Sequence, residues 1–387
     1  MRRNLTAAFT AALLIAALVL ALGGAATGAP PPRAPAEFFG IGPQTPLTVK
    51  DAEYMKAGGI GVVRMAVPWS SVQEKNKKGV YNWAGLDEGV GIAARAGLRV
   101  LPFLYGTPHW LAAKPTTLPV DSARQRSEWK AFLTAAVLRY GPGGEFWAKH
   151  SPSGGVGVPY VPYEPATPKP APIRRPLPIR AWQIWNEANF FYFAYPASPS
   201  RYARLLVASS KAIKAADPGA KVILSGLFAK PTAPYPKGMP AAKFLEQIYR
   251  FPGIARHFDG ISLHPYAIDT GILKEYVEEF HDVTVENHDR VPLYITEMGW
   301  GSQPDFHEVA FEQGPQGQVR QLRGAYKYLL ENRTRLDVRQ VYWFSWKDIQ
   351  GDCNFCDSVG LFQEGPAFRP KPSWKAFVQI SRGRLRP

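Results

Sequence analysis

Hydrophobic and polar positions along the chain follow two alternating patterns. Short runs of apolar and β-branched residues, bounded by Gly, Pro or polar residues, are typical of strands covered on both faces. Between them, apolar residues recur at three- and four-residue spacing, as in Tyr202, Leu205, Leu206 and Ile213, which predicts amphipathic helices. The expected strands are 38–42, 61–67, 98–104, 179–185, 221–225, 260–264, 293–296 and 340–346. The expected helices are 51–57, 86–96, 123–139, 200–216, 241–250, 272–280, 318–332 and 373–380.

The order of these elements predicts the fold. Eight alternations of strand and helix favour an α/β chain whose parallel sheet closes into a (β/α)8 TIM barrel over residues 38–387. A Gly- and Pro-rich insertion at 141–178 follows a helix, which places it on the face away from the chemistry of such barrels, and we expect a solvated linker there. An ordered insertion, a lid and a mobile loop are the alternatives. A second Pro-rich loop, 229–240, follows the fifth strand and is placed to wall a substrate cleft.

The first residues have the order of a secretory signal. Arg2 and Arg3 precede an uncharged apolar stretch at 7–22, which small residues follow. This predicts a signal peptide over 1–29 and a short tether over 30–37, with an uncleaved membrane anchor as the alternative. We therefore expect a secreted protein that is extracellular or associated with the cell envelope, and a monomer.

The chain has two cysteines, Cys353 and Cys356, in one late loop. In an oxidising compartment this spacing favours a local disulfide. A redox C-x-x-C would normally open a helix after a strand, and a structural zinc site needs four ligands. We find no P-loop, dinucleotide fingerprint, G-x-S-x-G elbow or H-E-x-x-H pattern, so the sequence predicts neither a metal nor an organic cofactor.

The formal charge is +15 and the isoelectric point is near 9.7. Part of this charge lies in the expected signal peptide. The rest favours solubility and attraction to anionic surfaces. Because no recognition helix, zinc finger or RNA-binding signature is present, nucleic acid is not the expected partner. An acidic glycan is a partner that would suit an exported basic protein. The alternative is that the excess positive charge lies on the outer helices and has no role in binding.

Two stretches carry the candidate chemistry. Residues 182–187 read Trp-Gln-Ile-Trp-Asn-Glu, and residues 293–300 read Leu-Tyr-Ile-Thr-Glu-Met-Gly-Trp. In a parallel barrel all strand C-termini open on one face, so Glu187 and Glu297 would face one cleft from the fourth and seventh strands. Retaining sugar hydrolysis needs such a pair, one carboxyl as proton donor and one as nucleophile. A separation of about 5 Å predicts retention, and about 6.5–9.5 Å predicts inversion.

The two motifs resemble those of clan A of the glycoside hydrolases. Within the clan, residues 38–377 are most similar to family 39, of β-xylosidases, α-L-iduronidases and bacterial endoglycosidases, with family 5 next. The resemblance implies a retaining double displacement on a poly- or oligosaccharide. It implies that Glu187 is the acid/base, that Glu297 is the nucleophile, and that Asn186 holds the sugar 2-hydroxyl.

The two proposed roles require different surroundings. Glu187 must stay protonated near neutral pH, so it needs an apolar surround and the nearby charge of Glu297. Glu297 must stay ionised, so it needs a cation or hydrogen-bond donors. Arg64, in the second expected strand, is the candidate cation. His264 and Tyr266, at the end of the sixth expected strand, are the candidate donors, and the resemblance puts an arginine and a His/Tyr in matching places.

Four further residues are candidates for substrate binding: His109 and Trp110 after the third expected strand, Trp300 after the seventh, and Trp346 at the end of the eighth. Aromatic rings on the open face of the barrel would stack on the apolar faces of sugars. Trp346 resembles the tryptophan platform that the clan places under the cleaved sugar. Packing in the core is the alternative for each tryptophan.

One position departs from the family pattern. Many relatives carry proline directly after the acid/base glutamate, whereas Ala188 and Asn189 follow here. This leaves open the exact family and the shape of the subsite for the leaving group. Two other functions also stay open at this point. One is a transglycosylase that remodels cell-wall or capsular glycan, and the other is a barrel that binds glycans without catalysis.

Overall fold

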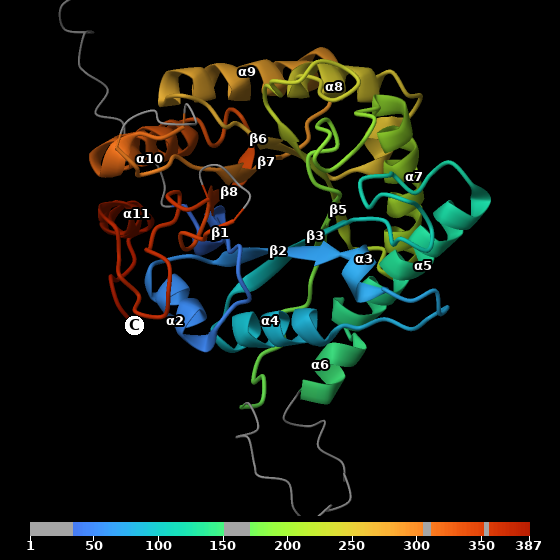
Figure 1. The fold of residues 1–387 in the computed structure, drawn as a ribbon, viewed down its shortest axis with the longest axis horizontal. Helices are drawn as coiled ribbons and strands as arrows, with labels where there is room; N and C mark the ends of the chain where they lie inside the picture. Colours follow the sequence, from blue (N-terminus) through green and yellow to red (C-terminus); the bar gives the residue numbers. More distant parts are fainter. Residues whose placement is uncertain (1–33, 151–170, 305–310, 352–355) are drawn as a thin grey trace, which may run out of the picture. The chain divides into compact units, whose positions relative to one another are not determined.

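A computed structural model describes residues 34–150, 171–304, 311–351 and 356–387. Within these residues, eight parallel strands close into a barrel (Figure 1). They are β1 (Phe39–Gly42), β2 (Val62–Pro68), β3 (Arg99–Tyr105), β4 (Ala181–Ile184), β5 (Lys221–Phe228), β6 (Gly260–His264), β7 (Leu293–Met298) and β8 (Val338–Phe344). Each strand pairs with its neighbours along the chain, and β8 closes the ring on β1, with Tyr342 opposite Gly40. This confirms the predicted (β/α)8 TIM barrel.

Helices cover the outside of the barrel (Figure 1). They are η1 (Ala36–Phe38), α2 (Val49–Ala57), α3 (Trp69–Val72), α4 (Ala84–Arg95), α5 (Ala123–Tyr140), α6 (Glu145–His150), α7 (Pro199–Ala216), α8 (Ala241–Tyr249), η3 (Ile254–His257), α9 (Thr270–Glu286), α10 (Gly314–Glu331) and α11 (Pro372–Ser381). Every expected strand and helix overlaps an observed one. The difference that matters most for the site is at β8. The observed strand is shifted by two residues toward the N-terminus relative to the predicted strand 340–346.

The helices begin where the local sequence supplies caps. At α2, the Thr48 side chain accepts from the Asp51 backbone N–H, while the Asp51 carboxylate accepts from the Thr48 backbone N–H. Ser122 and Gln125 make the same reciprocal pair at α5. Such capping boxes satisfy donors that the first helical turn leaves without a partner. The caps fix where each loop of the barrel ends and its helix starts.

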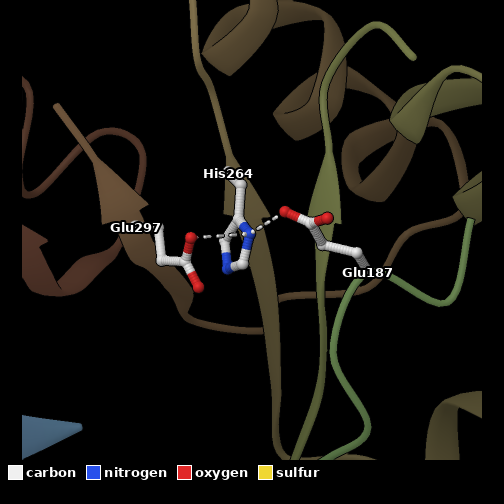
Figure 2. Close-up of side chains that lie close together, drawn as sticks. All are labelled: Glu187, His264 and Glu297. Atoms are coloured by element: carbon white, nitrogen blue, oxygen red, sulfur yellow. Dashed lines mark hydrogen bonds and ion pairs between the residues drawn. The ribbon is translucent and has the colours of Figure 1, made fainter. Parts of the chain in front are cut away.

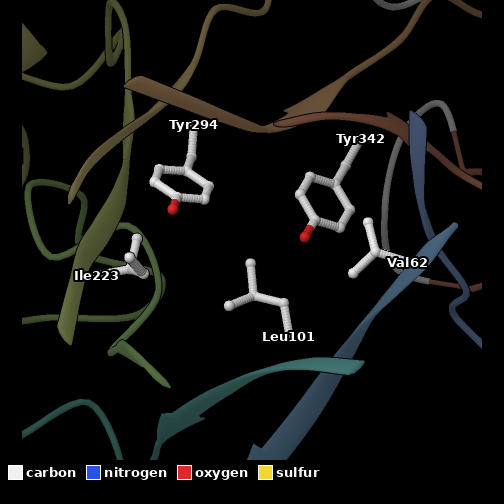
Figure 3. Packing of buried hydrophobic residues seen from close by; sticks show 5 residues of the cluster. All are labelled: Val62, Leu101, Ile223, Tyr294 and Tyr342. Carbon is white, nitrogen blue, oxygen red and sulfur yellow. The ribbon is translucent and has the colours of Figure 1, made fainter. Parts of the chain in front are cut away.

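The lower part of the barrel interior is apolar. Figure 3 shows Val62, Leu101, Ile223, Tyr294 and Tyr342 packed together there, and the most exposed of them is 8% accessible. They come from β2, β3, β5, β7 and β8. Because alternate residues of a strand face the same side, the residues two places further along β2, β3, β7 and β8 form the next layer, while the register of β5 shifts between Ile223 and Gly226.

That next layer combines a polar network with the aromatic rings of Phe103 and Phe344. Arg64 lies two residues beyond Val62, and Gln183 enters the same layer from β4. The Gln183 amide nitrogen donates to Ser262 Oγ at 2.7 Å, and its Oε1 accepts from Arg64 Nε at 2.7 Å. These side chains are at most 3% exposed, and hydrogen bonds between strands help to fix them. They form the floor beneath the mouth of the barrel.

The predictions for the N-terminal segment and for the insertion at 141–178 can be compared with the structure only in part. The expected signal peptide, part of the tether (30–33) and the middle of the insertion (151–170) lie outside the described residues. The start of the insertion forms α6, where Phe146 and Trp147 are buried and the Trp147 indole donates to Tyr140 O at 2.8 Å. This part packs on α5 and is not solvated linker. None of the helices described is long and apolar enough to cross a membrane.

Candidate active site

Glu187 lies in a sharp turn just beyond β4. The strand ends at Ile184 rather than at the glutamate, and the backbone of Trp185 (φ 70°) and of Glu187 (φ 38°) is left-handed. Residues other than glycine rarely adopt this conformation, so it must be held by its surroundings. The Trp185 ring is fully buried, and the Glu187 backbone N–H donates to Gly226 O at 3.1 Å. The turn thereby holds the Glu187 carboxyl at the mouth of the barrel, where it is 7% exposed.

Glu297 lies inside β7, one residue before the strand ends, and is also 7% exposed. Its Oε1 accepts a hydrogen bond from Arg64 Nη1 at 2.5 Å, and its Oε2 accepts from the Tyr266 hydroxyl at 2.8 Å. Burial and then the charge of Glu297 raise the pKa of Tyr266 well above its usual range, so this phenol stays protonated and remains a donor. Both carboxylate oxygens of Glu297 therefore have fixed donors.

His264 lies between the two glutamates (Figure 2). Its Nδ1 is 2.9 Å from Glu187 Oε1 and 3.6 Å from Glu297 Oε2, and its Nε2 is 3.0 Å from Thr296 Oγ1. A side chain at Gly226 would collide with this ring, because a Cβ there would lie 2.0 Å from Nε2. Burial, and then the charge of Arg64, lower the pKa of His264 well below its usual range. The imidazole is thus neutral at neutral pH and fixed in place.

The separation of the two carboxylates distinguishes between the two hydrolytic mechanisms. One oxygen of Glu187, one oxygen of Glu297 and a ring nitrogen of His264 all lie within 4.8 Å of one another. A pair separated by about 5 Å suits direct attack by one carboxylate, whereas an inverting pair leaves about 6.5–9.5 Å for a water. The geometry matches the retaining arrangement.

The two carboxyl groups have different surroundings. Burial, followed by the charge of Glu297, raises the pKa of Glu187 well above its usual range, and Arg64 opposes this only in part. Arg64 and Tyr266 donate to Glu297 and not to Glu187. A buried carboxyl beside another carboxylate holds its proton at a pH where an exposed one would not. Glu187 is therefore the group suited to give a proton.

This pKa shift predicts a stability effect. The folded protein binds the Glu187 proton more tightly than the unfolded chain, so the free energy of unfolding falls as pH rises from 4.5 through the raised pKa. Glu187→Gln has no carboxyl to ionise at this position, so its free energy of unfolding does not fall for this reason as pH rises. We expect its Tm to exceed that of the parent by about 2 °C or more near pH 8, with a smaller difference near pH 4. Thermal unfolding at both pH values measures this, with the exposed Glu88→Gln on α4 as control; a difference that shrinks as pH rises would contradict it.

Arg64 connects the polar network to the two segments that carry Glu187 and Glu297. Besides Glu297, it donates to Gln183 Oε1 and to Asn186 Oδ1, each at 2.7 Å. Its guanidinium carbon lies 3.9 Å from the centre of the Phe103 ring. The side chain is 3% exposed, so all of these interactions are shielded from water. Arg64 holds Asn186 and Glu297 in fixed positions relative to one another.

Removing this cation leaves buried acceptors without donors. We expect Arg64→Met to lower the free energy of unfolding by about 3–5 kcal/mol, because Glu297 then keeps an uncompensated buried charge. The matched control is Arg99→Met. Arg99 also pairs with a glutamate, Glu37, at 2.5 Å, but the two side chains are 44% and 54% exposed. That change should cost about 1 kcal/mol or less. Urea unfolding of both variants measures the difference, and equal losses would contradict the assigned role of Arg64.

The same cluster has the spacing of a metal site, because Glu187, His264 and Glu297 each offer one ligand atom. Two observations favour proton chemistry. His264 Nδ1 and Glu187 Oε1 already contact one another at 2.9 Å, and the Arg64 guanidinium at 2.5 Å supplies the positive charge that Glu297 requires. A cation held by these atoms would be repelled by that guanidinium.

The structure brings Arg64, Asn186, His264 and Tyr266 together around the glutamates, and it places Trp300 and Trp346 in the core. Trp300 is fully buried and donates to Ala267 O at 2.8 Å. Trp346 is 1% exposed and donates to Asp51 Oδ1 at 2.7 Å, next to Trp374. Neither ring has a face open to a sugar, so their prediction as stacking residues was wrong. The alternative of core packing holds for both.

His109 and Trp110 lie in the loop after β3. His109 is exposed, while the Trp110 indole donates to Gln73 O at 2.9 Å and its ring packs edge-on against Trp69. These contacts join the loop after β2 to the loop after β3. Among the described residues, no recorded contact links either side chain to the glutamates. Their predicted role in substrate binding stays a prediction.

Three residues of the site were not predicted: Gln183, Thr296 and Phe344. Gln183 had a signal, because a polar residue inside a buried apolar run needs a partner. Phe344, half-buried at the end of β8, has its ring centre 6.1 Å from that of Tyr266, at 86°. Since β8 ends two residues earlier than predicted, Phe344 takes the position at the strand end that was assigned to Trp346.

The predicted disulfide falls partly outside the described residues. Cys353 is not among them, and Cys356 is 2% exposed with its sulfur 2.8 Å from Gln44 Nε2. The pairing of the two cysteines stays a prediction.

Comparison with known proteins bears on the fold. No family profile matches the chain, and no curated protein matches it. Solved structures do. A family 39 glycoside hydrolase from the gut symbiont Bacteroides cellulosilyticus WH2 matches with a TM-score of 0.62 and 19% identity, over 90% of this chain and 64% of that one. A monomeric β-xylosidase from Caulobacter crescentus CB15 matches with 0.57 and 18%, over 91% and 69%. An enzyme of glycoside hydrolase family 5 from Streptomyces cattleya matches with 0.56 and 16%, over 89% and 80%.

The chain has the fold of clan A glycoside hydrolases. The resemblance predicted from the sequence, to family 39 first and family 5 next, is confirmed at this level. The chain spans 64% of the length of the Bacteroides enzyme. At identities of 16–19% the likeness establishes the architecture, and the activity has to be argued from the residues of the site.

Proposed function

We propose that this protein is a retaining glycoside hydrolase that cleaves O-glycosidic bonds of a poly- or oligosaccharide. The observation that supports this most strongly is the Glu187–Glu297 pair. Their carboxylate oxygens approach within 4.8 Å, and only Glu297 receives hydrogen bonds from Arg64 and Tyr266. One group is thereby suited to hold a proton and the other to act as an anion.

The mechanism follows from these two states. Glu297 attacks the anomeric carbon while Glu187 gives its proton to the glycosidic oxygen, so the C–O bond to the leaving group breaks as a glycosyl ester forms. Glu187, now ionised, takes a proton from water, and that water attacks the anomeric carbon and displaces Glu297. This proton restores Glu187 to its starting state. Each of the two displacements inverts the anomeric carbon, so the product has the configuration of the substrate.

The surrounding side chains support each step. Arg64 and Tyr266 stabilise Glu297 as an anion when it leaves the glycosyl ester. His264, neutral and 2.9 Å from Glu187, orients that carboxyl. Arg64 donates a hydrogen bond to Asn186 Oδ1, so the Asn186 amide nitrogen is the group that donates to the sugar 2-hydroxyl. Phe344, at the end of β8, offers an aromatic surface near the bound sugar.

The setting of the reaction is part of the proposal. We assign the protein to the extracellular space or the cell envelope, on the basis of the signal-like residues 1–29. Its partner is a glycan, and it acts as a monomer without a cofactor. A transglycosylase would use the same site and would form new glycosides at high acceptor concentration. The intact carboxylate pair gives a non-catalytic glycan-binding barrel no specific support.

A panel of glycosides and polysaccharides tests the activity. It should include β-xylosides and mannosyl substrates, given the β-xylosidase and the Manβ1-4GlcNAc complex among the structural neighbours. We expect release of reducing ends from at least one member. Proton NMR of the first product should show the anomeric configuration of the substrate before mutarotation. An inverted first product would overturn the retaining mechanism, and no release from any member would argue against hydrolysis.

A further inference from the structure

The loop after β5, residues 229–240, carries a hollow that the catalytic site does not use. The hollow has a volume of about 280 Å³ and is lined by this loop and by the start of α8, including Pro231, Tyr235, Met239 and Lys243. Its walls are mostly apolar and one charged side chain reaches it. Small-ligand sites combine apolar walls with a few polar groups in this way.

This loop is bonded to the segment that carries Glu187. Asn189, two residues after Glu187, is fully buried. Its Nδ2 donates to Phe228 O and to Met239 O, each at 2.7 Å, and its Oδ1 accepts from the Phe228 N–H at 3.0 Å. Phe190 also pairs with Gly238 across the two loops. The wall of the hollow is therefore fixed relative to Glu187 through Asn189.

Aromatic rings surround this junction. Phe191 and Tyr192 stack with ring centres 4.2 Å apart, and Tyr192 is 64% exposed. Tyr235, on the facing loop, is also 64% exposed. Exposed tyrosines on two adjoining loops present the flat apolar surfaces on which sugar rings stack.

The charge of the junction is positive. Residues 229–240 contain Lys230 and Lys237 and no aspartate or glutamate, and Lys243 follows on α8. Lys230 pairs with Glu279 at 3.1 Å. Lys237 lies 5.8 Å from the centre of the Phe191 ring, and Lys243 lines the hollow. The junction thus combines stacking surfaces with two lysines suited to pair with an anion.

We propose that residues 229–240, with Phe191, Tyr192 and Lys243, form the subsite for the leaving group and that it takes a sugar unit carrying a carboxylate. The assignment to the leaving-group side rests on the proposed hydrolysis, because Glu187 protonates the departing oxygen and this loop is bonded to the residues directly after it. The tyrosines stack on the sugar, and Lys237 and Lys243 pair with the carboxylate. The substrate class is a glycan that contains uronic acid.

Binding measured without turnover tests the proposal. Oligosaccharides from glucuronoxylan, polygalacturonate and alginate are titrated into the full chain carrying Glu297→Gln. Each is compared with the same material after its carboxyl groups are reduced to hydroxymethyl groups. At low ionic strength we expect at least one acidic ligand to bind about tenfold more tightly than its reduced form. Adding Lys237→Gln and Lys243→Gln should abolish this preference, while Lys375→Gln, an exposed lysine on α11, should keep it.

Each outcome has a distinct meaning. Tyr235→Ala should weaken binding of the acidic and reduced forms by the same factor, since stacking does not depend on the carboxylate. Equal affinity for both forms, a preference that survives the double lysine change, or no binding of any acidic ligand would overturn the proposal. If acidic ligands bind preferentially but the parent protein hydrolyses nothing, the acidic subsite stands and the proposed hydrolase activity is rejected. If the parent hydrolyses only neutral glycans, the hydrolase activity stands and the acidic subsite is rejected.

Discussion

Turnover is expected to fall by about 10⁴-fold or more when Glu297 is replaced by alanine, because the reaction then lacks its nucleophile. Added azide should restore part of the rate. The small anion fits the space left by the carboxylate and attacks the anomeric carbon, while Glu187 still protonates the leaving group. Only one displacement takes place, so the glycosyl azide should have the configuration opposite to that of the substrate. Rate measurements with and without azide, and NMR of the azide product, check this.

Two controls accompany that experiment. Glu297→Gln keeps the volume of the side chain and should be as inactive as Glu297→Ala, but without equal rescue, since no space opens. Glu246→Ala removes a half-exposed glutamate on α8 that pairs with Arg250, and it should leave turnover unchanged. Full activity in Glu297→Ala would end the assignment of Glu297 as nucleophile.

Replacement of Glu187 by alanine should give a loss that depends on the leaving group. For sugar or alkyl leaving groups we expect a fall of about 10³-fold, because departure then lacks its proton donor. For dinitrophenyl glycosides the first displacement needs no proton, so formation of the glycosyl ester should change little. Azide should then attack this ester and give a product of retained configuration. Steady-state rates across a series of aryl glycosides, with product NMR, measure the effect.

The pH dependence gives a second readout for Glu187. In the parent, kcat/KM should fall as pH rises through the raised pKa of Glu187, because the ionised carboxyl cannot donate. The alkaline limb should be absent in Glu187→Ala. A variant with the same alkaline limb as the parent, or with equal losses for all leaving groups, would show that another group is the acid.

The barrel could be predicted because its physical basis repeats along the chain. Buried parallel strands need apolar residues on both faces and amphipathic helices to cover them, and that alternation is visible locally. The residues that surround the two glutamates could also be predicted from the sequence. Arg64, His264 and Tyr266 are polar or aromatic groups at or within expected strands that end on the same face, and the structure places all three against the glutamates.

The ends of the strands were less predictable, and they decide which side chains reach the cleft. At β4 the chain turns with positive φ at Trp185 and Glu187, which no local propensity favours. At β8 the apolar run continues past Phe344 to Trp346, so hydrophobicity alone could not locate the point at which the chain leaves the barrel. Tertiary contacts, such as the bond from Trp346 to Asp51 of α2, fix that point.

Trapping the covalent intermediate would identify Glu297 as the nucleophile without relying on a mutation. Dinitrophenyl 2-deoxy-2-fluoro glycosides of several sugars are incubated with the full chain, since the fluorine slows both displacements and the activated leaving group lets only the first proceed. Intact mass should rise by one fluorosugar, and peptide mapping should place the label on Glu297. Label on any other residue, or continued turnover of a related substrate by protein that never accumulates label, would contradict the account.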